Sequence, residues 1–370
     1  MMWWYLGTVA GSFGLSVVLT PVVRRLALRW RVVDDPATDP NRKQHPQVTP
    51  LLGGLAVILS STIVWIVLLA AGKFSGSEFP AKYVIGLLIA SFVIAIGGVL
   101  DDRWRLRPAQ QLVWPMLAII IVGIAGIGVS FVTNPFGGLL YLDQWQWDIW
   151  KNGAGVAYQL TLWADLFTFV WLLGAMYTTK ILDGLDGLVS GVGVIGAVII
   201  FLLTQQPFVD QPAVGLIALS LAGAAGGFLV FNWSPASIFL GESGSLFIGF
   251  ILGVLSIISG GKIATALLIL GLPILDLAWV MIRRATRQHT SPFTTADRSH
   301  LHFRLLDAGL SVRQSVLTLY SVMTVFGLST LFVSGRMKLF TLAGNILALI
   351  ALAAWVTIRS KRRERTGGVV

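Results

Sequence analysis

Residues 178–191, around which the chain is organised, read Thr-Thr-Lys-Ile-Leu-Asp-Gly-Leu-Asp-Gly-Leu-Val-Ser-Gly. Apolar segments at 160–176 and 188–203 flank it, and each is long enough to be a membrane helix. Lys180, Asp183 and Asp186 lie between them. Charges beside a bilayer are unfavourable, so by default they mark a functional site. Because Asp183 and Asp186 are three residues apart, a helical turn would place both carboxylates on one face.

Gly184 and Gly187 keep this turn slim, so that another backbone or a ligand can come close. The alternative interpretation is a polar helix end with glycine turns. Two carboxylates and a lysine within seven residues, bracketed by membrane segments, favour a site.

The composition is that of an integral membrane protein. Of the 370 residues, 55% are hydrophobic and 12% are charged, with a mean hydropathy of +0.80. Soluble domains are about 45–50% apolar and about 25% charged. Cysteine is absent, which excludes disulfides and thiolate metal sites. The first apolar run has no basic segment before it and no small-residue cleavage site after it, which indicates a retained helix.

The apolar runs predict an all-α, polytopic membrane helix bundle. About eleven ranges qualify as spans: 3–27, 51–72, 81–100, 110–132, 162–181, 187–205, 213–231, 245–260, 263–282, 313–333 and 338–358. An outer amino terminus and a cytoplasmic carboxyl terminus place 21 of the 27 lysines and arginines on the cytoplasmic side. The basic residues behind the net charge of +10 then orient the chain in the membrane and contact lipid headgroups, and nucleic acid is not an expected partner.

We expect one integral membrane domain over 1–370, with 359–370 as a basic cytoplasmic tail. The outer loop 133–161 is rich in tryptophan and fits an aromatic belt at the outer interface.

Two polar groups lie in the first two cytoplasmic loops. Arg42, Lys43 and His45 precede Gly53-Gly54, and basic residues before a glycine-rich helix start can hold a phosphate. The alternative is a basic loop that only orients the chain. Asp101 and Asp102 close the third span and can hold Mg²⁺ or supply a general base. The alternative there is a helix end capped by surface salt bridges.

Two further groups lie later in the chain. Gly241-Glu242-Ser243-Gly244-Ser245 opens the eighth span, where free N–H groups attract an anion or a carboxylate-held metal. A plain N-cap at Ser243 or Ser245 is the alternative. His300 and His302 are two residues apart, so an extended segment would point both the same way. With Arg298 and Arg304 they suit contact to pyrophosphate or sugar, and two histidines make a poor zinc site.

In this order, the motifs resemble the polyprenyl-phosphate N-acetylhexosamine-1-phosphate transferases, glycosyltransferase family 4, from about residue 20 to 320. The resemblance implies transfer of a sugar 1-phosphate from a UDP-sugar to undecaprenyl or another polyprenyl phosphate. UMP is released with Mg²⁺, or Mn²⁺ as a substitute, as the first membrane step of cell-wall or surface polysaccharide synthesis. It also implies a bacterial plasma membrane location, with the active site facing the cytoplasm, and it leaves a homodimer open.

The resemblance assigns roles by position. Asp101, Asp102, Asp183 and Asp186 would be catalytic, with the first two beside the lipid phosphate and the metal and the last two at the nucleotide and diphosphate. Glu242 and Asp102 would hold the metal. Arg42, Lys43, His45, Lys180, Arg298, His300, His302 and Arg304 would bind substrates. The Asp-Arg-Ser-His-Leu-His form is similar to the N-acetylglucosaminyl branch, which implies UDP-N-acetylglucosamine as donor.

Four positions depart from the family pattern, which has Asp at Glu242, Asn at Lys180, Lys at Gln111 and a third His at Phe303. We expect Lys180 and Glu242 to form an ion pair that competes with Mg²⁺ for the carboxylate.

Other functions stay open at this point. A non-catalytic or lipid-binding relative, or a phospho-N-acetylmuramoyl-pentapeptide transferase, are the alternatives within the family. A transporter would need charges at mid-membrane, where Asp276 is the one candidate within a span. A CDP-alcohol phosphotransferase is excluded because Asp-Gly-Leu-Asp-Gly-Leu-Val-Ser-Gly lacks the Ala-Arg of that class.

Overall fold

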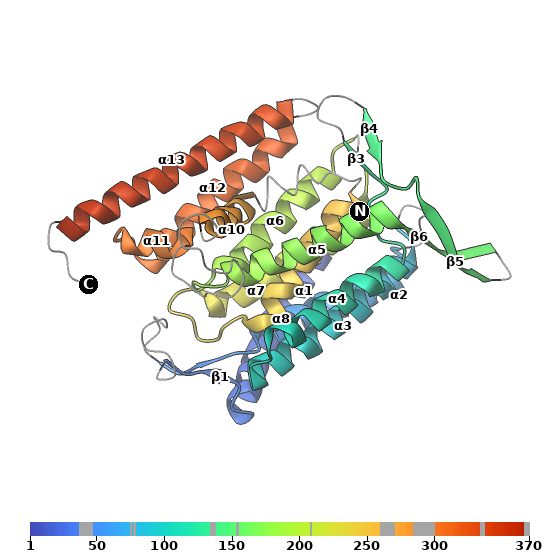
Figure 1. Ribbon diagram of the computed structural model, residues 1–370. Coiled ribbons are helices and arrows are strands. Elements are labelled where there is room, and N and C mark those ends of the chain that lie inside the picture. Colours follow the sequence, from blue (N-terminus) through green and yellow to red (C-terminus); the bar gives the residue numbers. More distant parts are fainter. Residues whose placement is uncertain are drawn as a thin grey trace.

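The computed structural model describes residues 1–36, 47–74, 76, 79–133, 138–152, 155–207, 209–259, 271–283, 300–333 and 337–365. Helices dominate this part of the chain (Figure 1). They are α1 (Met2–Arg29), α2 (Gly53–Ala70), α3 (Ala81–Trp104), α4 (Pro108–Ile124), α5 (Leu162–Leu182), α6 (Leu188–Thr204), α7 (Pro212–Asn232), α8 (Gly241–Ile258), α10 (Gly271–Arg283), α11 (Leu301–Asp307), α12 (Val312–Phe332) and α13 (Met337–Arg365).

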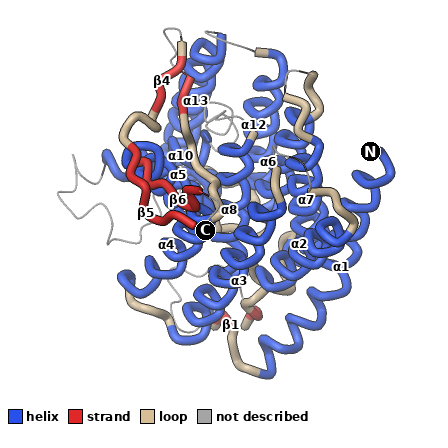
Figure 2. Tube along the Cα trace, turned by 90° about the vertical axis from the view of Figure 1, so that its right-hand side faces the viewer, coloured by secondary structure: helices blue, strands red, loops and turns tan. Residues whose placement is uncertain are grey.

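The described strands form three antiparallel pairs. These are β1 (Val33–Asp34) with β2 (Thr49–Pro50), β3 (Phe131–Thr133) with β4 (Leu139–Tyr141), and β5 (Gln146–Asn152) with β6 (Gly155–Thr161). Strands β3 to β6 lie together at one side of the helical bundle (Figure 2). The loop 133–161, which was expected only to carry an aromatic belt, therefore contains a hairpin and half of another. Trp145 and Trp147 are exposed there, their rings 6.4 Å apart.

The chain is a multi-pass helical membrane protein. Seven of the described helices, α1, α2, α3, α7, α8, α12 and the segment Phe340–Ser360 of α13, are long and apolar enough to cross a bilayer. A described helix falls in each of the eleven predicted ranges. The fourth range was predicted too long, because α4 ends at Ile124 and the chain continues into β3. Its sequence stays apolar beyond that point, so hydropathy alone does not show the end of the helix.

Helix α8 lies at the centre of the bundle, and 83% of this 18-residue helix is buried inside the protein. Its neighbours approach closely because glycines face it. A Cβ added at Gly54 of α2 would lie 2.1 Å from the Gly244 nitrogen, and one at Gly98 of α3 would lie 2.3 Å from the Ser243 Cα. Inside a bilayer, helices associate through close van der Waals contact, which small residues permit. A larger residue at Gly54 or Gly98 would therefore push α8 away from α2 or α3.

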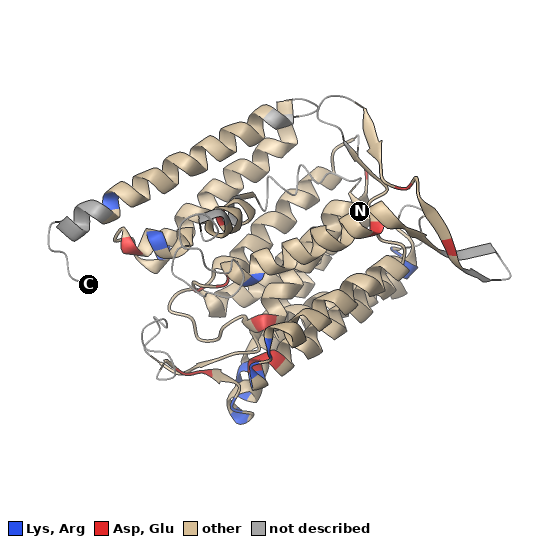
Figure 3. Cartoon of the chain, in the orientation of Figure 1, with Lys and Arg blue, Asp and Glu red and all other residues tan. Residues whose placement is uncertain are grey.

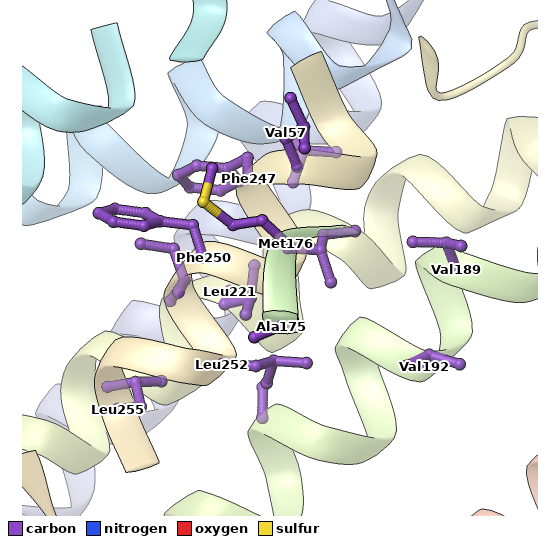
Figure 4. Packing of buried hydrophobic residues seen from close by; sticks show 14 of the residues in the cluster. Val57, Ala175, Met176, Val189, Val192, Leu221, Phe247, Phe250, Leu252 and Leu255 are labelled. Carbon is purple, nitrogen blue, oxygen red and sulfur yellow. The ribbon is translucent and has the colours of Figure 1, made fainter. Parts of the chain in front are cut away.

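Apolar side chains complete this core (Figure 4). Ala175 and Met176 of α5 lie against Phe247, Phe250 and Leu252 of α8, all nearly inaccessible to solvent. In the same way, α1 packs on α7 through small residues at helical spacing, since an added Cβ at Gly223 would meet Ser12 Oγ at 2.1 Å. Some buried hydroxyls in these helices bond to their own backbone, as Ser12 does to the carbonyl of Thr8, 2.8 Å away.

Most of the charged residues that are described lie toward the ends of the helices, and few lie in the middle of the bundle (Figure 3). The end of α3, the end of α5 and the start of α8, which carry Asp102, Lys180 and Glu242, meet at the end of the bundle away from the β3 to β6 strands (Figure 1).

Candidate active site

The start of α8 is tied to the end of α3. Asp102 accepts hydrogen bonds from the Glu242 backbone N–H, with distances of 3.1 Å to Oδ1 and 3.3 Å to Oδ2. Gly241 has φ +73°, and a Cβ there would lie 2.5 Å from Asp102 Oδ2, so only glycine fits. The expected anion at this helix start is thus the chain's own Asp102 carboxylate. The alternative of a serine N-cap is wrong, because the N-cap residue is Leu240 and no side chain caps the helix.

Lys180 and Glu242 form the predicted ion pair. Lys180 Nζ lies 2.5 Å from Glu242 Oε1, and the two side chains are 20% and 13% exposed. Lys180 is near the end of α5, and Glu242 is in the first turn of α8. The ammonium also donates to Gln111 Oε1 at 2.9 Å. Gln111 Nε2 in turn donates to Asp101 Oδ1 at 3.0 Å. Asp101 is therefore held by hydrogen bonds, including one from Leu106 N at 2.8 Å.

Asp183 and Asp186 do not share a helical face. Helix α5 ends at Leu182 and α6 begins at Leu188, so the two aspartates lie in an irregular turn between them. Gly187 has φ +79°, a left-handed conformation that interrupts the helix. Asp186 Oδ2 accepts from Ala236 N at 3.0 Å, which joins this turn to the segment before α8.

Asn232 holds this turn through hydrogen bonds, and the sequence had indicated no role for it. Asn232 is 4% exposed and lies at the end of α7. Its Oδ1 accepts from Gly187 N at 3.1 Å and from Ser190 Oγ at 2.7 Å, and its Nδ2 donates to Ile238 O at 3.0 Å. An amide among apolar residues at the end of a span is the signal that could have revealed it.

Asp183 is an available carboxylate at this site. Its side chain has no hydrogen-bond or ion-pair partner among the described residues, and the residue is exposed. The surrounding protein raises the pKa of Asp183 to about 8, first by displacing water from around the carboxyl and then through the charges of Glu242 and Asp186. Water at its exposed side moderates this rise in pKa.

The histidines lie beside the same turn. His300 is the N-cap residue of α11 and His302 is in its first turn, so the expected extended segment is wrong. The rings are nonetheless parallel, with an interplanar angle of 6° and centroids 5.7 Å apart. A Cβ at Gly184 would lie 2.5 Å from His302 Nε2, which explains the glycine at this position. His302 is 1% exposed with neither ring nitrogen bonded, and this burial lowers its pKa to about 4.

Asp276 of α10 orients the first histidine. Its Oδ2 lies 2.9 Å from His300 Nδ1, and its Oδ1 accepts from Leu301 N at 2.9 Å. Asp276 was noted in the sequence only as a candidate ion-path residue. Arg304 donates to Ala353 O at 3.1 Å and to Thr357 Oγ1, so it fastens α11 to α13 in this structure.

The phosphate cradle expected at Gly53-Gly54 is not available. Gly53 N donates to Phe239 O at 3.0 Å, and Gly54 N donates to Leu240 O at 2.6 Å. These donors hold the segment before α8 and cannot also hold a phosphate. Arg42, Lys43, His45 and Arg298 lie outside the described residues.

The donor set suits a metal ion that arrives with phosphate oxygens. No three His, Asp or Glu side chains among the described residues form a ready-made metal site. Mg²⁺ commonly takes only one or two carboxylates and fills its other positions with water and substrate phosphate. Asp102 keeps free lone pairs, since its hydrogen bonds come from one backbone N–H, and Glu242 follows that N–H directly. These oxygens therefore fit Mg²⁺, although Lys180 occupies part of Glu242.

Fold and site together define a multi-pass membrane protein with a carboxylate-rich site where its helices end. The model of the family Glycosyl transferase family 4 matches residues 84–260. The chain belongs to this family, the polyprenyl-phosphate N-acetylhexosamine-1-phosphate transferases.

Relatives from several organisms cover most of the chain. A probable undecaprenyl-phosphate N-acetylglucosaminyl 1-phosphate transferase of Bacillus subtilis is 32% identical over 85% of this chain and 81% of its own length. A decaprenyl-phosphate N-acetylglucosaminephosphotransferase of Mycolicibacterium smegmatis is 32% identical over 83% and 76%. A phospho-N-acetylmuramoyl-pentapeptide-transferase of Bacillus thuringiensis is 27% identical over 84% and 90%.

Proposed function

We propose that the protein transfers N-acetylglucosamine 1-phosphate from UDP-N-acetylglucosamine to a polyprenyl phosphate and releases UMP. The names of the Bacillus subtilis and Mycolicibacterium smegmatis relatives support the sugar phosphate and the polyprenyl acceptor. The identity to the pentapeptide transferase is lower, at 27%, which favours the N-acetylglucosaminyl activity. This step would begin the membrane stage of cell-wall or surface polysaccharide synthesis.

The observation that carries the proposal is the convergence of Asp102, Asp183 and Glu242 at the helix ends, with Lys180 paired to Glu242. Phosphoryl transfer depends mainly on positioning the phosphates and stabilising their charge, which such a site provides. Asp183 has free oxygens, and its raised pKa suits a group that accepts the proton of the acceptor's phosphate. Asp186 and Asn232 keep its turn in place.

Mg²⁺ is the cofactor we propose, held by Asp102 and Glu242 together with substrate oxygens. When bound, it would neutralise negative charge on the diphosphate. The unbonded ring nitrogens of His302, beside Gly184, would contact the sugar diphosphate, and Asp276 would fix the orientation of the His300 ring.

The proposed setting is the plasma membrane of a bacterium, with eleven spans, an outer amino terminus and a site that faces the cytoplasm. The distribution of basic residues and the bacterial relatives support it. Reporter fusions after Gly76 and after Arg313 test the orientation, because the proposal places the first outside and the second inside. A fusion that puts Arg313 outside contradicts it.

The decisive experiment is UMP release by the purified full-length protein in detergent, with polyprenyl phosphate, Mg²⁺ and a panel of UDP-sugars. We expect release with UDP-N-acetylglucosamine and a loss of about 100-fold or more in Asp183→Asn. Asp165→Asn is the matched control, since Asp165 lies at the opposite end of α5 and bonds Thr161 N. Release only with a UDP-muramoyl peptide, or equal rates in wild type and Asp183→Asn, would overturn the proposal.

A further inference from the structure

Four side chains from four helices form one continuous chain of contacts at the site. Asp101 of α3 accepts from Gln111 of α4 at 3.0 Å, and Gln111 accepts from Lys180 of α5 at 2.9 Å. Lys180 in turn lies 2.5 Å from Glu242 of α8. Three of these residues, Gln111, Lys180 and Glu242, stand where the resemblance to the family implies Lys, Asn and Asp. These three positions are therefore joined in one connected structure.

The orientation of this chain is fixed by the Gln111 amide. Its Nε2 has two acceptors, Asp101 Oδ1 and the Leu106 carbonyl, each at 3.0 Å. A carboxylate and a carbonyl can only accept, so the amide nitrogen must face them and the amide oxygen must face Lys180. Gln111 thereby positions the ammonium, and Asp101 positions Gln111. Reversal of the amide would place its N–H groups against the ammonium.

Lys180 has no other charged partner in the described residues. Besides Glu242 and Gln111, the Lys180 ammonium lies near the Tyr177 ring, whose centroid is 5.2 Å from Nζ. The ammonium is thus committed to one oxygen of Glu242. Asp102 accepts a hydrogen bond from the backbone N–H of the same residue, Glu242.

We propose that Lys180 is a built-in counter-cation for Glu242, that Gln111 and Asp101 are its positioning residues, and that a divalent cation at Glu242 has to displace it. This inference rests on the proposed function, which places the divalent cation at Glu242. It follows that the metal affinity of this protein is set by an internal competitor. The displaced ammonium stays beside the turn that carries Asp183, where a diphosphate would be its next anionic partner.

Mn²⁺ binding to the full-length protein in detergent without substrates, followed by electron paramagnetic resonance, tests this. Removing the competitor by Lys180→Met should tighten Mn²⁺ binding about tenfold, equivalent to about 1.4 kcal/mol. Gln111→Met changes no charge and should tighten Mn²⁺ binding less, because the ammonium stays in place and loses only its hydrogen bond to Gln111. Lys82→Met is the matched control, since Lys82 is a lysine at the first turn of α3, far along the helix from Asp102, and binding should not change.

The Glu242→Gln background separates competition at Glu242 from a general effect of charge. If Lys180 acts through Glu242, Lys180→Met should have no effect on Mn²⁺ binding in that background. A tenfold effect that persists there, or unchanged or weaker binding in Lys180→Met alone, overturns the inference. Size-exclusion profiles and melting temperatures establish that each variant is folded, and Gln111→Met gives the answer if the lysine variants are not.

The two proposals fail in different ways. Absence of UMP release from every UDP-sugar, together with tighter Mn²⁺ binding in Lys180→Met, would reject the proposed reaction and keep the counter-cation. UMP release by wild type, with Mn²⁺ binding that ignores Lys180, would keep the reaction and reject the counter-cation.

Discussion

Asn232 anchors the turn between α5 and α6 that carries Asp183. It makes three hydrogen bonds, to Gly187 N, Ser190 Oγ and Ile238 O, and is 4% exposed. Asn232→Leu keeps the four side-chain heavy atoms and their branching but removes all three hydrogen bonds. Ser190 can turn its hydroxyl to another acceptor, whereas Gly187 N and Ile238 O are backbone groups that cannot move away. These two stay buried without a partner.

The expected magnitude follows from those two groups. A buried donor or acceptor that loses its partner costs about 1–3 kcal/mol. For two such groups we expect the free energy of unfolding to fall by about 3 kcal/mol, reduced if water enters. The turn that carries Asp183 also loses its anchor, and a misplacement worth about 1.4 kcal/mol lowers turnover tenfold. We therefore expect at least a tenfold fall in the rate of UMP release.

The assay pairs thermal unfolding in detergent with UMP release from UDP-N-acetylglucosamine. Ser190→Ala is the matched control, because it removes one hydrogen bond and leaves the backbone groups paired. It should cost about 1 kcal/mol and leave turnover within a few fold. Wild-type stability and turnover in Asn232→Leu would refute the conclusion that this amide holds the turn.

Three further predictions concern the neighbours of that turn. Gly184→Ala should lower turnover at least tenfold, because its Cβ would lie 2.5 Å from His302 Nε2, whereas Gly174→Ala, with open space around it, should match wild type. Asp276→Ala should destabilise the protein by about 2 kcal/mol in thermal unfolding, since Leu301 N loses its acceptor; an unchanged melting temperature would contradict this. His302 has its pKa lowered from 6.5 to about 4, so the unfolded chain binds its proton first as pH falls. Stability should be fully present above pH 6.5 and should decrease between pH 6.5 and about 4, by up to about 3 kcal/mol, and His302→Leu should flatten this slope in melting curves.

Much of the fold could be predicted from the sequence because a bilayer imposes simple constraints. Apolar runs of about 18 or more residues indicate spanning helices, and a helix lies in each range so identified. The ion pair of Lys180 and Glu242 was also predicted, because the resemblance places the end of the fifth span and the start of the eighth span at one diphosphate site.

The turn between α5 and α6 could not be predicted in the same way. The spacing of Asp183 and Asp186 is compatible with a helix, and local pattern cannot show that Asn232, 45 residues beyond Gly187, holds the chain in a left-handed conformation there. The positions of the histidines are likewise fixed by a residue distant in the sequence. The extended segment that was expected to point both the same way is absent, because α11 begins at Leu301, whose N–H Asp276 accepts, and the two rings lie parallel in this helical turn.

The two glycine-rich helix starts show most clearly where sequence reasoning ends. Gly53-Gly54 and Gly241-Glu242 both offer free backbone N–H groups, and both were expected to attract an anion. In the fold, the donors of the first bind the carbonyls of Phe239 and Leu240. That contact fixes the residues just before α8, so the second start meets the Asp102 carboxylate. The N–H groups of Gly53 and Gly54 are thus used to fix the chain before α8, and this contact places the Glu242 N–H beside Asp102.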